Sequence, residues 1–295
     1  MAVALDAWWA EAGEPASWTV IDAGAGPGTL LRAVLAAEPR CAAAMLPVAV
    51  DRAMAQRARH PEDIESRADL PEGPITGVVI ANELLDNLPW RLVERTAEGW
   101  NEVWVDVDAA GGLIETLRPV QDGTSSHADS LAPEAALGAR VPLQEAAAAW
   151  LTDALRRVVQ GRIVVLDYGA PSVDLAARAV GEWMRTYRGH ERGDDPLQDP
   201  GTQDITADVA TDQLHTVALA DEERSQAEFL QAHGLDDLVA EGRRIWTERA
   251  HLGDLEAIKG RSRVNEAAAL TDPDGLGAFR VLEWAKVRSA RRPGR

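Results

Sequence analysis

The chain has 295 residues, of which 46% are hydrophobic and 26% charged, and its formal net charge is −18 at pH 7. The length suits one large domain, and the acidic excess argues against a nucleic-acid partner, because phosphate backbones are bound through Lys and Arg. No apolar run approaches the ~18 residues of a membrane-spanning helix, and the single cysteine, Cys41, excludes an intramolecular disulfide, so we expect a soluble protein of a reducing, cytoplasmic compartment.

The first half of the sequence alternates short apolar runs with helical stretches, as the βα units of a parallel sheet do. It begins with a short predicted helix, whose acidic Asp6 and Glu11 argue against a secretory signal. The predicted helices that follow cover residues 28–40, a stretch beginning at 53, and 143–160. The predicted strands cover residues 17–24, 45–52, 75–83 and 161–169. Together they predict a doubly wound α/β fold.

The remaining segments predict additions to this sheet. Alternation over residues 91–120, with turns at Glu98-Gly99 and Gly111-Gly112, predicts an inserted antiparallel hairpin or meander. Residues 121–142 are turn-rich and predict a surface connection.

The C-terminal part predicts a lid and helices. Residues 184–214 are polar, with Gly and Pro, and predict a long irregular loop that forms a lid or is disordered. Residues 221–233 and 235–271 predict helices, and residues 277–287 a last strand. We therefore expect a single domain over residues 1–295, with a β insertion at 91–120 and a lid and helical substrate-side region at 184–271.

The loop after the first predicted strand, VIDAGAGPGT, places Asp22 ahead of Gly24, Gly26 and Gly28. Glycines between a strand and a helix let the backbone approach a ligand closely. Their spacing does not match the dinucleotide fingerprint G-x-G-x-x-G, and no G-K-[ST] follows, as a P-loop would require. The pattern D-x-G-x-G-x-G is typical of the nucleoside loop of Rossmann-like methyltransferases that use S-adenosylmethionine (SAM). The alternative is a structural tight turn.

A second acidic residue, Asp51, ends the second predicted strand. At this place in a Rossmann fold, an acidic side chain accepts hydrogen bonds from ribose hydroxyls. The alternative is that Asp51 caps the helix that follows, which Asp also does well.

The segment VVIANELLDNLPWRLV places Asn82, Glu83 and Asp86 after a buried strand. In open α/β sheets the carboxyl ends of the strands face the ligand crevice, so Asn82 and Glu83 are expected beside the methyl donor. A carboxylate there can hold a cationic acceptor and take its proton. The alternative is capping at the surface.

Four segments together carry a family resemblance: IDAGAGPGTLLRAVL, ANELLDNLP, VVLDYG and DPGTQDITADV. In this order and at these spacings the chain resembles the MidA-like family of SAM-dependent methyltransferases, over roughly residues 17–287. A protein arginine methyltransferase that is a mitochondrial complex I assembly factor belongs to that family. The resemblance implies a Rossmann-like α/β fold with a mostly parallel twisted sheet, the β insertion and a C-terminal helical and lid region.

The resemblance also implies roles for individual residues. SAM is the implied cofactor, and no metal is expected, because the six histidines show no H-E-x-x-H or paired spacing. The residues implied to contact SAM are Asp22, Gly24, Gly26 and Gly28, with Asp51 on the ribose. Those implied to face the acceptor are the catalytic candidates Asn82, Glu83 and Asp86. Those implied near the cleft or in the lid are Tyr168, Gly169, Asp199, Pro200, Gly201, Asp204 and Thr206.

Three features depart from the family pattern. Family members carry a longer segment before the glycine loop, so the N-terminus is expected to be shortened here. The usual aromatic pair after Asn-Glu is Leu84-Leu85 in this chain, and Asp208 stands where a histidine is expected.

The expected activity is methyl transfer from SAM to a nitrogen, with an arginine of a partner protein, such as a subunit of a respiratory complex, as acceptor. One alternative is a small-molecule or O-methyltransferase of the same fold, since the fold does not determine the acceptor. Another is a non-catalytic SAM-binding assembly factor. A homo-oligomer is compatible with the sequence.

Overall fold

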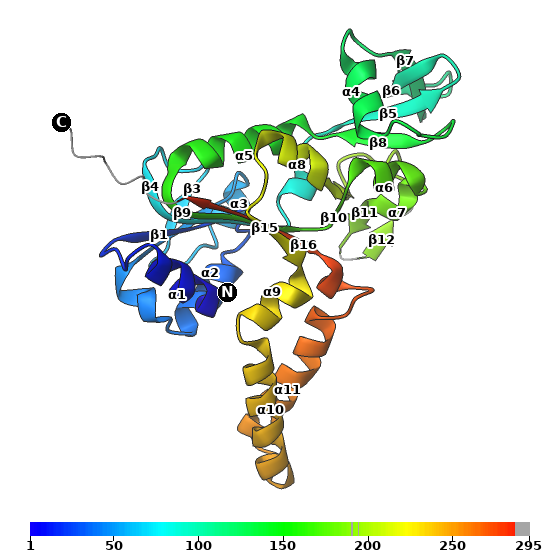
Figure 1. Cartoon of the computed structure of the whole chain (residues 1–295). Helices are drawn as coiled ribbons and strands as arrows, with labels where there is room; N and C mark the ends of the chain where they lie inside the picture. Colours follow the sequence, from blue (N-terminus) through cyan, green and yellow to red (C-terminus); the bar gives the residue numbers. More distant parts are fainter. Residues whose placement is uncertain (190, 194, 287–295) are drawn as a thin grey trace, which may run out of the picture. The chain divides into compact units, whose positions relative to one another are not determined.

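The computed structural model describes residues 1–189, 191–193 and 195–286, and they divide into two compact units (Figure 1). The first unit comprises Met1–Asn82, Ala154–Leu166 and Ala220–Arg295, and the second comprises Glu83–Asp153 and Asp167–Leu219. The expectation of one domain over residues 1–295 stays a prediction. Residue 287, the last of the predicted final strand, lies outside the described residues.

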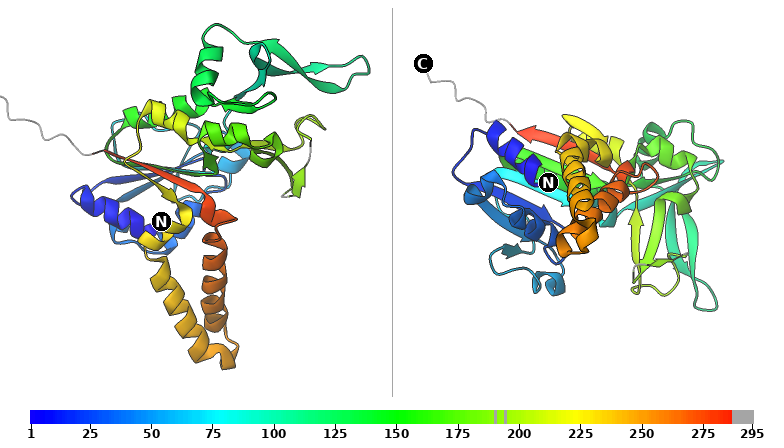
Figure 2. Two further views of the ribbon diagram at one scale, coloured as in Figure 1. Left: turned by 45° about the vertical axis from the view of Figure 1, so that its right-hand side comes forward. Right: turned by 90° about the horizontal axis from the view of Figure 1, so that it is seen from below.

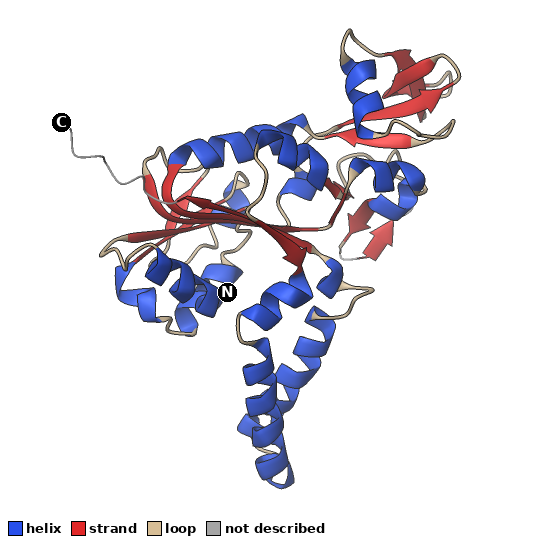
Figure 3. Ribbon diagram, viewed as in Figure 1, coloured by secondary structure: helices blue, strands red, loops and turns tan. Residues whose placement is uncertain are grey.

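A mostly parallel sheet forms the centre of the first unit (Figure 3). Its strands, in spatial order, are β15 (Glu222–Ser225), β16 (Arg280–Lys286), β9 (Val158–Asp167), β4 (Ile75–Asn82), β1 (Trp18–Ala23), β2 (Met45–Val50) and β3 (Glu65–Arg67). β1 pairs in parallel with both β2 and β4, as β2 does with β3 and β4 with β9, whereas β15 and β16 are antiparallel. The predicted α/β class is confirmed.

The central strands are almost wholly buried, which explains why they read as continuous apolar runs in the sequence. The helices around them are α1 (Ala2–Glu11), α2 (Thr29–Ala36), η1 (Arg40–Ala44) and α3 (Met54–Arg57). Leu5 and Trp8 of α1 and Leu31 of α2 share one core cluster with Val20 and Ile80 of the sheet. Helix α2 ends at Ala36, earlier than the predicted helix over 28–40, and α3, where a helix was expected from residue 53, is a single turn.

Two glycines permit the close packing of β1, β4 and β9. Gly77 lies opposite Thr19 and Gly161, and φ is +158° at Gly77 and +122° at Gly161. A Cβ at Gly77 would lie 1.8 Å from the carbonyl oxygen of Thr19, and one at Gly161 would lie 1.9 Å from that of Gly77. The three backbones therefore approach so closely that only glycine fits at these two positions.

The C-terminal helices differ from the prediction in detail. The expected helix over 221–233 begins as strand β15 and becomes helical only at α9 (Gln226–Ala232). The stretch 235–271 forms a hairpin of α10 (Leu235–Arg249) and α11 (Leu255–Leu270), which lie side by side in every view (Figure 2). Gly253, with φ +60°, lies in the turn between them. Among the described residues, no helix is long and apolar enough to cross a membrane.

The second unit contains the predicted β insertion. Over residues 91–120 the chain forms an antiparallel meander, as expected, and a fourth strand completes its sheet. The strands, in order along the chain, are β5 (Arg91–Thr96), β6 (Gly99–Val107), β7 (Leu113–Pro119) and β8 (Arg140–Leu143). The expectation that residues 121–142 are only a surface connection is wrong, because they contain both β8 and helix α4 (Thr124–Leu131). Ala128 and Leu131 of α4 are buried against Trp100 of the meander.

The expectation that residues 184–214 form a long irregular loop is also wrong. This segment pairs as a small antiparallel sheet of β12 (Glu191–Gly193), β11 (Met184–Arg188) and β13 (Asp204–Ala207). Thr186, Thr206 and Ala207 are buried in this sheet. The polar composition of the segment therefore did not reveal that one of its faces packs against the rest of the unit. The rest of the unit consists of β10 (Gly169–Ala170) paired with β14 (Val209–Ala210), helices α6 (Ser172–Ala177), α7 (Val180–Trp183) and α8 (Thr211–Val217), and part of α5 (Glu145–Arg157).

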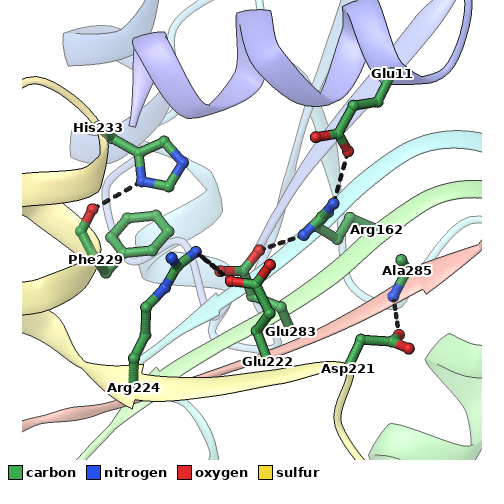
Figure 4. Close-up of polar contacts among 9 residues, drawn as sticks. All are labelled: Glu11, Arg162, Asp221, Glu222, Arg224, Phe229, His233, Glu283 and Ala285. Carbon is green, nitrogen blue, oxygen red and sulfur yellow. Dashed lines mark hydrogen bonds and ion pairs between the residues drawn. The ribbon is translucent and has the colours of Figure 1, made fainter.

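A buried carboxylate ties together the β15 edge of the large sheet (Figure 4). The side chain of Glu283 on β16 is 0% exposed, and it pairs with Arg162 of β9, at 2.7 Å, and with Arg224 of β15. Arg162 in turn pairs with Glu11 of α1 at 2.7 Å, and Arg224 with Glu222 at 3.0 Å. One buried anion thus connects three strands, and through Arg162 a helix.

We expect Glu283→Gln to destabilise the protein by about 3 kcal/mol or more, because it leaves two largely buried guanidinium groups without their shared counter-charge. Glu222→Gln is the matched control, since Glu222 pairs with the same Arg224 but its side chain is 50% exposed, and it should cost less than about 1 kcal/mol. Urea unfolding measures both. Equal stabilities of the two variants would contradict the prediction.

Candidate functional site

The glycine loop lies where the chain order of the sheet reverses. β1 has β2 on one side and β4 on the other, so the connections from these strands diverge at the carboxyl end of β1. Open α/β sheets bind their ligands at such a switch point. The residues that follow β1 are Gly24, Gly26 and Gly28, and the last of these caps the N-terminus of α2.

The backbone of this loop requires its glycines. Gly24, Gly26 and Gly28 have φ values of +75°, +52° and +77°, in the region that favours glycine. The N–H of Gly24 donates to the carbonyl oxygen of Val50 at 2.9 Å, which fixes the loop to the end of β2. The loop is therefore a defined turn at the edge of the sheet.

Asp51 holds the same loop from the other side. Its Oδ2 accepts the N–H of Gly26 at 2.9 Å, and its Oδ1 accepts the N–H of Ala53 at 2.8 Å. Asp51 is not the cap of α3, because the N-cap residue of that helix is Ala53 and no side-chain hydrogen bond caps it. Each carboxylate oxygen can accept more than one hydrogen bond, so Asp51 retains acceptor capacity for a ligand.

Asp22 is a buried carboxyl group at the end of β1. Its exposed fraction is 3%, and burial, helped by the nearby charge of Asp51, raises its pKa to about 7. A buried acid with a pKa in this range favours a cation beside it, because the cation stabilises the charged form.

His60 is a member of this site that sequence analysis missed. Its Nε2 lies 2.8 Å from the carbonyl oxygen of Gly26, and its Nδ1 lies 2.8 Å from Oγ of Ser66. Because a carbonyl only accepts, Nε2 must carry the proton, and in the neutral ring Nδ1 accepts from the serine. His60 follows the short helix α3, and no sequence motif marks it.

The residues of the loop fit a nucleoside with a cationic group. A Cβ built on Gly26 would meet nothing within 4 Å, so space lies open beside the loop. Asp22 and Asp51 supply carboxylate acceptors, and the glycine turn leads into the N-terminus of α2. These features suit SAM, which carries a sulfonium and an amino acid tail but no phosphate.

The acceptor-side candidates follow β4. Asn82 is the last residue of β4 and of the first unit, and its side chain is exposed. Glu83 begins the second unit with φ +50°, a value that costs energy in a non-glycine residue and occurs often at functional sites. Asp86, in the turn η2 (Leu85–Asn87), is 2% exposed.

Asp167 organises this turn, and sequence analysis missed it as well. Its Oδ2 accepts the N–H groups of Leu85, at 2.9 Å, and Asp86, at 3.3 Å, and its Oδ1 accepts the N–H of Tyr168 at 3.0 Å. Burial, and then the charge of Asp86, raise the pKa of Asp167 well above its usual range. The only sequence signal was its place before Tyr168 at the end of a buried strand.

Asp86 and Tyr168 complete an acidic cluster in the second unit, which we define as Glu83, Asp86, Asp167 and Tyr168. Burial, and then the charge of Glu83, raise the pKa of Asp86 to about 6. The hydroxyl of Tyr168 donates to Oε2 of Glu83 at 3.4 Å, and burial together with the neighbouring acids raises the pKa of Tyr168. The cluster thus gathers three carboxyl groups around one tyrosine.

The expected lid residues lie on other elements of the second unit, and one of these, β13, contacts the turn η2. Asp199 pairs with Arg188 at 3.2 Å, and Asp204 and Thr206 lie on β13, where Thr206 is opposite Arg185 of β11. Gly169 begins β10. Asp208, in the place of the expected histidine, is 5% exposed and pairs with Arg178 and Arg185, each at 2.9 Å.

A family model described as "Putative S-adenosyl-L-methionine-dependent methyltransferase" matches residues 1–229. The match includes the glycine loop, Asp51 and the acidic cluster. The hairpin of α10 and α11 lies beyond its end.

Curated relatives carry the name protein arginine methyltransferase NDUFAF7, mitochondrial. The mouse (Mus musculus) protein is 29% identical over 152 residues, which cover 51% of this chain and 32% of that protein. The human (Homo sapiens) protein is 29% identical over 154 residues, with the same two shares. The chain thus matches about a third of the length of these relatives.

Solved structures from Burkholderia thailandensis are similar over nearly the whole chain. An uncharacterised protein is 27% identical, with a TM-score of 0.82 over 96% of this chain and 78% of that one. A second structure, bound to S-adenosyl-homocysteine, is also 27% identical, with a TM-score of 0.81 over 96% of this chain and 74% of that one.

The raised pKa of Asp22 predicts a pH dependence of stability. The folded state holds the Asp22 proton up to about pH 7, whereas the unfolded state releases it near the ordinary aspartate pKa of 3.8. Asp22 therefore lowers the free energy of unfolding progressively as the pH rises through this window. We expect Asp22→Asn to remove this loss, so that it gains up to about 4 kcal/mol relative to the wild type between pH 4 and pH 8.

Urea unfolding over this pH range measures the difference. The exposed carboxyl Asp69, whose side chain is 75% accessible, provides the control variant Asp69→Asn, which should follow the wild type. Parallel pH profiles for Asp22→Asn and the wild type would disprove the prediction.

The contact from His60 predicts an effect on cofactor binding. Loss of one hydrogen bond to the loop, in His60→Ala, should raise the Kd for S-adenosyl-homocysteine by about five- to ten-fold. His60→Gln keeps a donor and should recover part of the loss. Titration calorimetry measures the Kd, and His251→Ala, at an exposed position, is the control. Unchanged binding by His60→Ala would rule out this role.

Proposed function

The chain belongs to the MidA-like family of SAM-dependent methyltransferases, as its motifs indicated, and we propose that it methylates a nitrogen on an arginine side chain of a partner protein. The observation that carries the proposal is the acidic cluster around Tyr168 in the second unit. The names of the curated relatives support arginine as the acceptor. The cofactor, when bound, supplies the methyl group from its sulfonium.

The first unit would hold this cofactor through Asp22, Asp51 and the glycine loop. Asp51 offers acceptors for the ribose hydroxyls, and Asp22 offers a buried carboxylate for a positive charge. The similar structure from Burkholderia thailandensis is bound to S-adenosyl-homocysteine, which supports this cofactor for the chain.

The acidic cluster would orient the acceptor. A guanidinium group is planar and pairs with carboxylates through two parallel hydrogen bonds, and it stacks on aromatic rings. Glu83 is the exposed carboxylate of the cluster, and its hydrogen bond from Tyr168 fixes its direction. We assign Glu83 to orienting the guanidinium, with Asp86 in support.

Proton removal is the second task of the cluster, since a methylated guanidinium nitrogen must lose one proton. Asp86 has a pKa of about 6, so near neutral pH it is mostly ionised yet basic enough to accept a proton. Asn87 donates to Oδ1 of Asp86 at 2.7 Å, which leaves Oδ2 as the oxygen to accept it.

Finer features of the function stay predictions. They are a respiratory-complex subunit as the partner, a cytoplasmic location and a homo-oligomeric state. The single cysteine supports the cytoplasmic location, because it is compatible with a reducing compartment.

The direct test is incubation of the protein with methyl-labelled SAM and lysate of the source cell, followed by mass spectrometry of labelled products. Methylarginine in a protein product would support the proposal. A labelled small molecule would show an acceptor of another class, and binding of SAM without any transfer would show a non-catalytic protein.

Glu83→Gln keeps the shape of the side chain and removes its charge, so we expect turnover with the protein acceptor to fall about a hundred-fold. Glu98→Gln, at an exposed turn of the meander, is the matched control and should keep full activity. The labelled-methyl assay measures both. Full turnover by Glu83→Gln would overturn the role of Glu83.

A further inference from the structure

Arg185, on β11, is a cation of the chain itself that lies against the acidic cluster. Its guanidinium carbon is 5.1 Å from the centre of the Tyr168 ring, within the range of a cation–π contact. Its positive charge also lowers the pKa values of Asp86 and Tyr168, opposing their burial. A guanidinium group is thus already present on the ring where the proposed function places the acceptor.

Arg185 makes few aligned hydrogen bonds for so buried a group. Its Nη2 donates to the carbonyl oxygen of Glu182 at 3.0 Å. Its Nη1 lies 2.9 Å from Oδ1 of Asp208, but within the described residues neither atom makes a well-aligned hydrogen bond. Asp208 instead accepts an aligned hydrogen bond from Arg178, whose Nη2 donates to its Oδ2 at 2.9 Å. Charge more than hydrogen bonding therefore keeps Arg185 in place.

Space for a second position of Arg185 lies beside it. A cavity of about 350 Å³ in the second unit is lined by Arg185 and its neighbours on β11. Its lining residues include Glu115, which pairs with Arg140, the cation Arg192, and the carboxyl-bearing Asp195. A displaced Arg185 would thus have Asp195 as its nearest candidate counter-charge in the cavity.

We propose that Arg185 is an internal stand-in for the acceptor guanidinium, and that an incoming arginine must displace it from Tyr168 and the acidic cluster. This inference rests on the proposed function, since it takes arginine as the acceptor. It makes Arg185 a specificity-determining residue, because its competition lowers the apparent affinity of every acceptor, so that only a group that pairs strongly with the cluster still binds well. A neutral acceptor of the same shape pairs too weakly.

Direct binding tests the proposal, without SAM. The probe is acetyl-arginine methylamide, and acetyl-citrulline methylamide is its neutral counterpart. If Arg185 occupies the site about nine-tenths of the time, its removal in Arg185→Gln should tighten binding of the arginine probe about ten-fold, because the apparent affinity scales with the free fraction. The citrulline probe lacks the charge that pairs with the cluster, so it should bind far more weakly than the arginine probe in both proteins. Calorimetry or NMR titration gives the Kd values.

Arg188→Gln is the matched control, since it removes an arginine from the same strand, where the side chain is 52% exposed and pairs with Asp199. It should bind the arginine probe as the wild type does. If Arg185 only supports the fold of the cluster, Arg185→Gln will bind the probe equally or more weakly, and the proposal is wrong.

Arg185→Lys covers the case in which Arg185→Gln does not fold. It keeps the charge but loses the flat group on the ring, so binding should tighten by a smaller factor, and unchanged or weaker binding would again overturn the proposal. The outcomes separate the two proposals. Methylarginine formation without tighter probe binding would reject the stand-in alone, and tighter binding without any methyl transfer would reject the proposed function alone.

Discussion

The parallel pairing of β1 with β2 and β4 is the constraint on which the candidate cofactor site depends. Because the strands run in one direction, their carboxyl ends meet at one edge, and the register pairs Asp22 with Ala49 and Ile80. The glycine loop and Asp51 follow at that edge and bind each other through the N–H of Gly26. The close approach allowed by Gly77 extends the same pairing to β9.

The buried carboxyl groups of this protein are of two kinds, those paired with arginines and those without an ion pair among the described residues. Glu283 is fully buried, yet two guanidinium groups satisfy its charge, so it serves the fold. Asp22 and Asp167 are buried with no ion pair to another described residue, and burial raises the pKa of each. Such acids favour the arrival of a cation, which is why unpaired burial marks a functional site better than burial alone.

The sequence predicted the features that depend on local pattern. The strands of the parallel sheet, the meander and the positive-φ glycines all follow from apolar runs, alternation and glycine spacing. It failed where distant pairing decides the structure. Residues 184–214 look like a polar loop, yet β11 is completed by β13, and Thr206 is buried there. His60 and Asp167 were missed for the same reason, since each acts on backbone groups brought to it by the fold.

The net charge of −18 is consistent with the cationic ligands proposed for the two candidate sites. It argues against phosphate-bearing partners, and it equally favours cations, since an acidic protein attracts them over its whole surface. The sulfonium of SAM and the guanidinium of an arginine are both cations, and Asp22 in one unit and the acidic cluster in the other match them. The proposed role of Arg185 follows from the same attraction. It supplies a positive charge to the cluster while no acceptor is bound. Preference for a cationic acceptor would arise from charge pairing with the cluster, and exchange with Arg185 would raise the affinity that an acceptor needs.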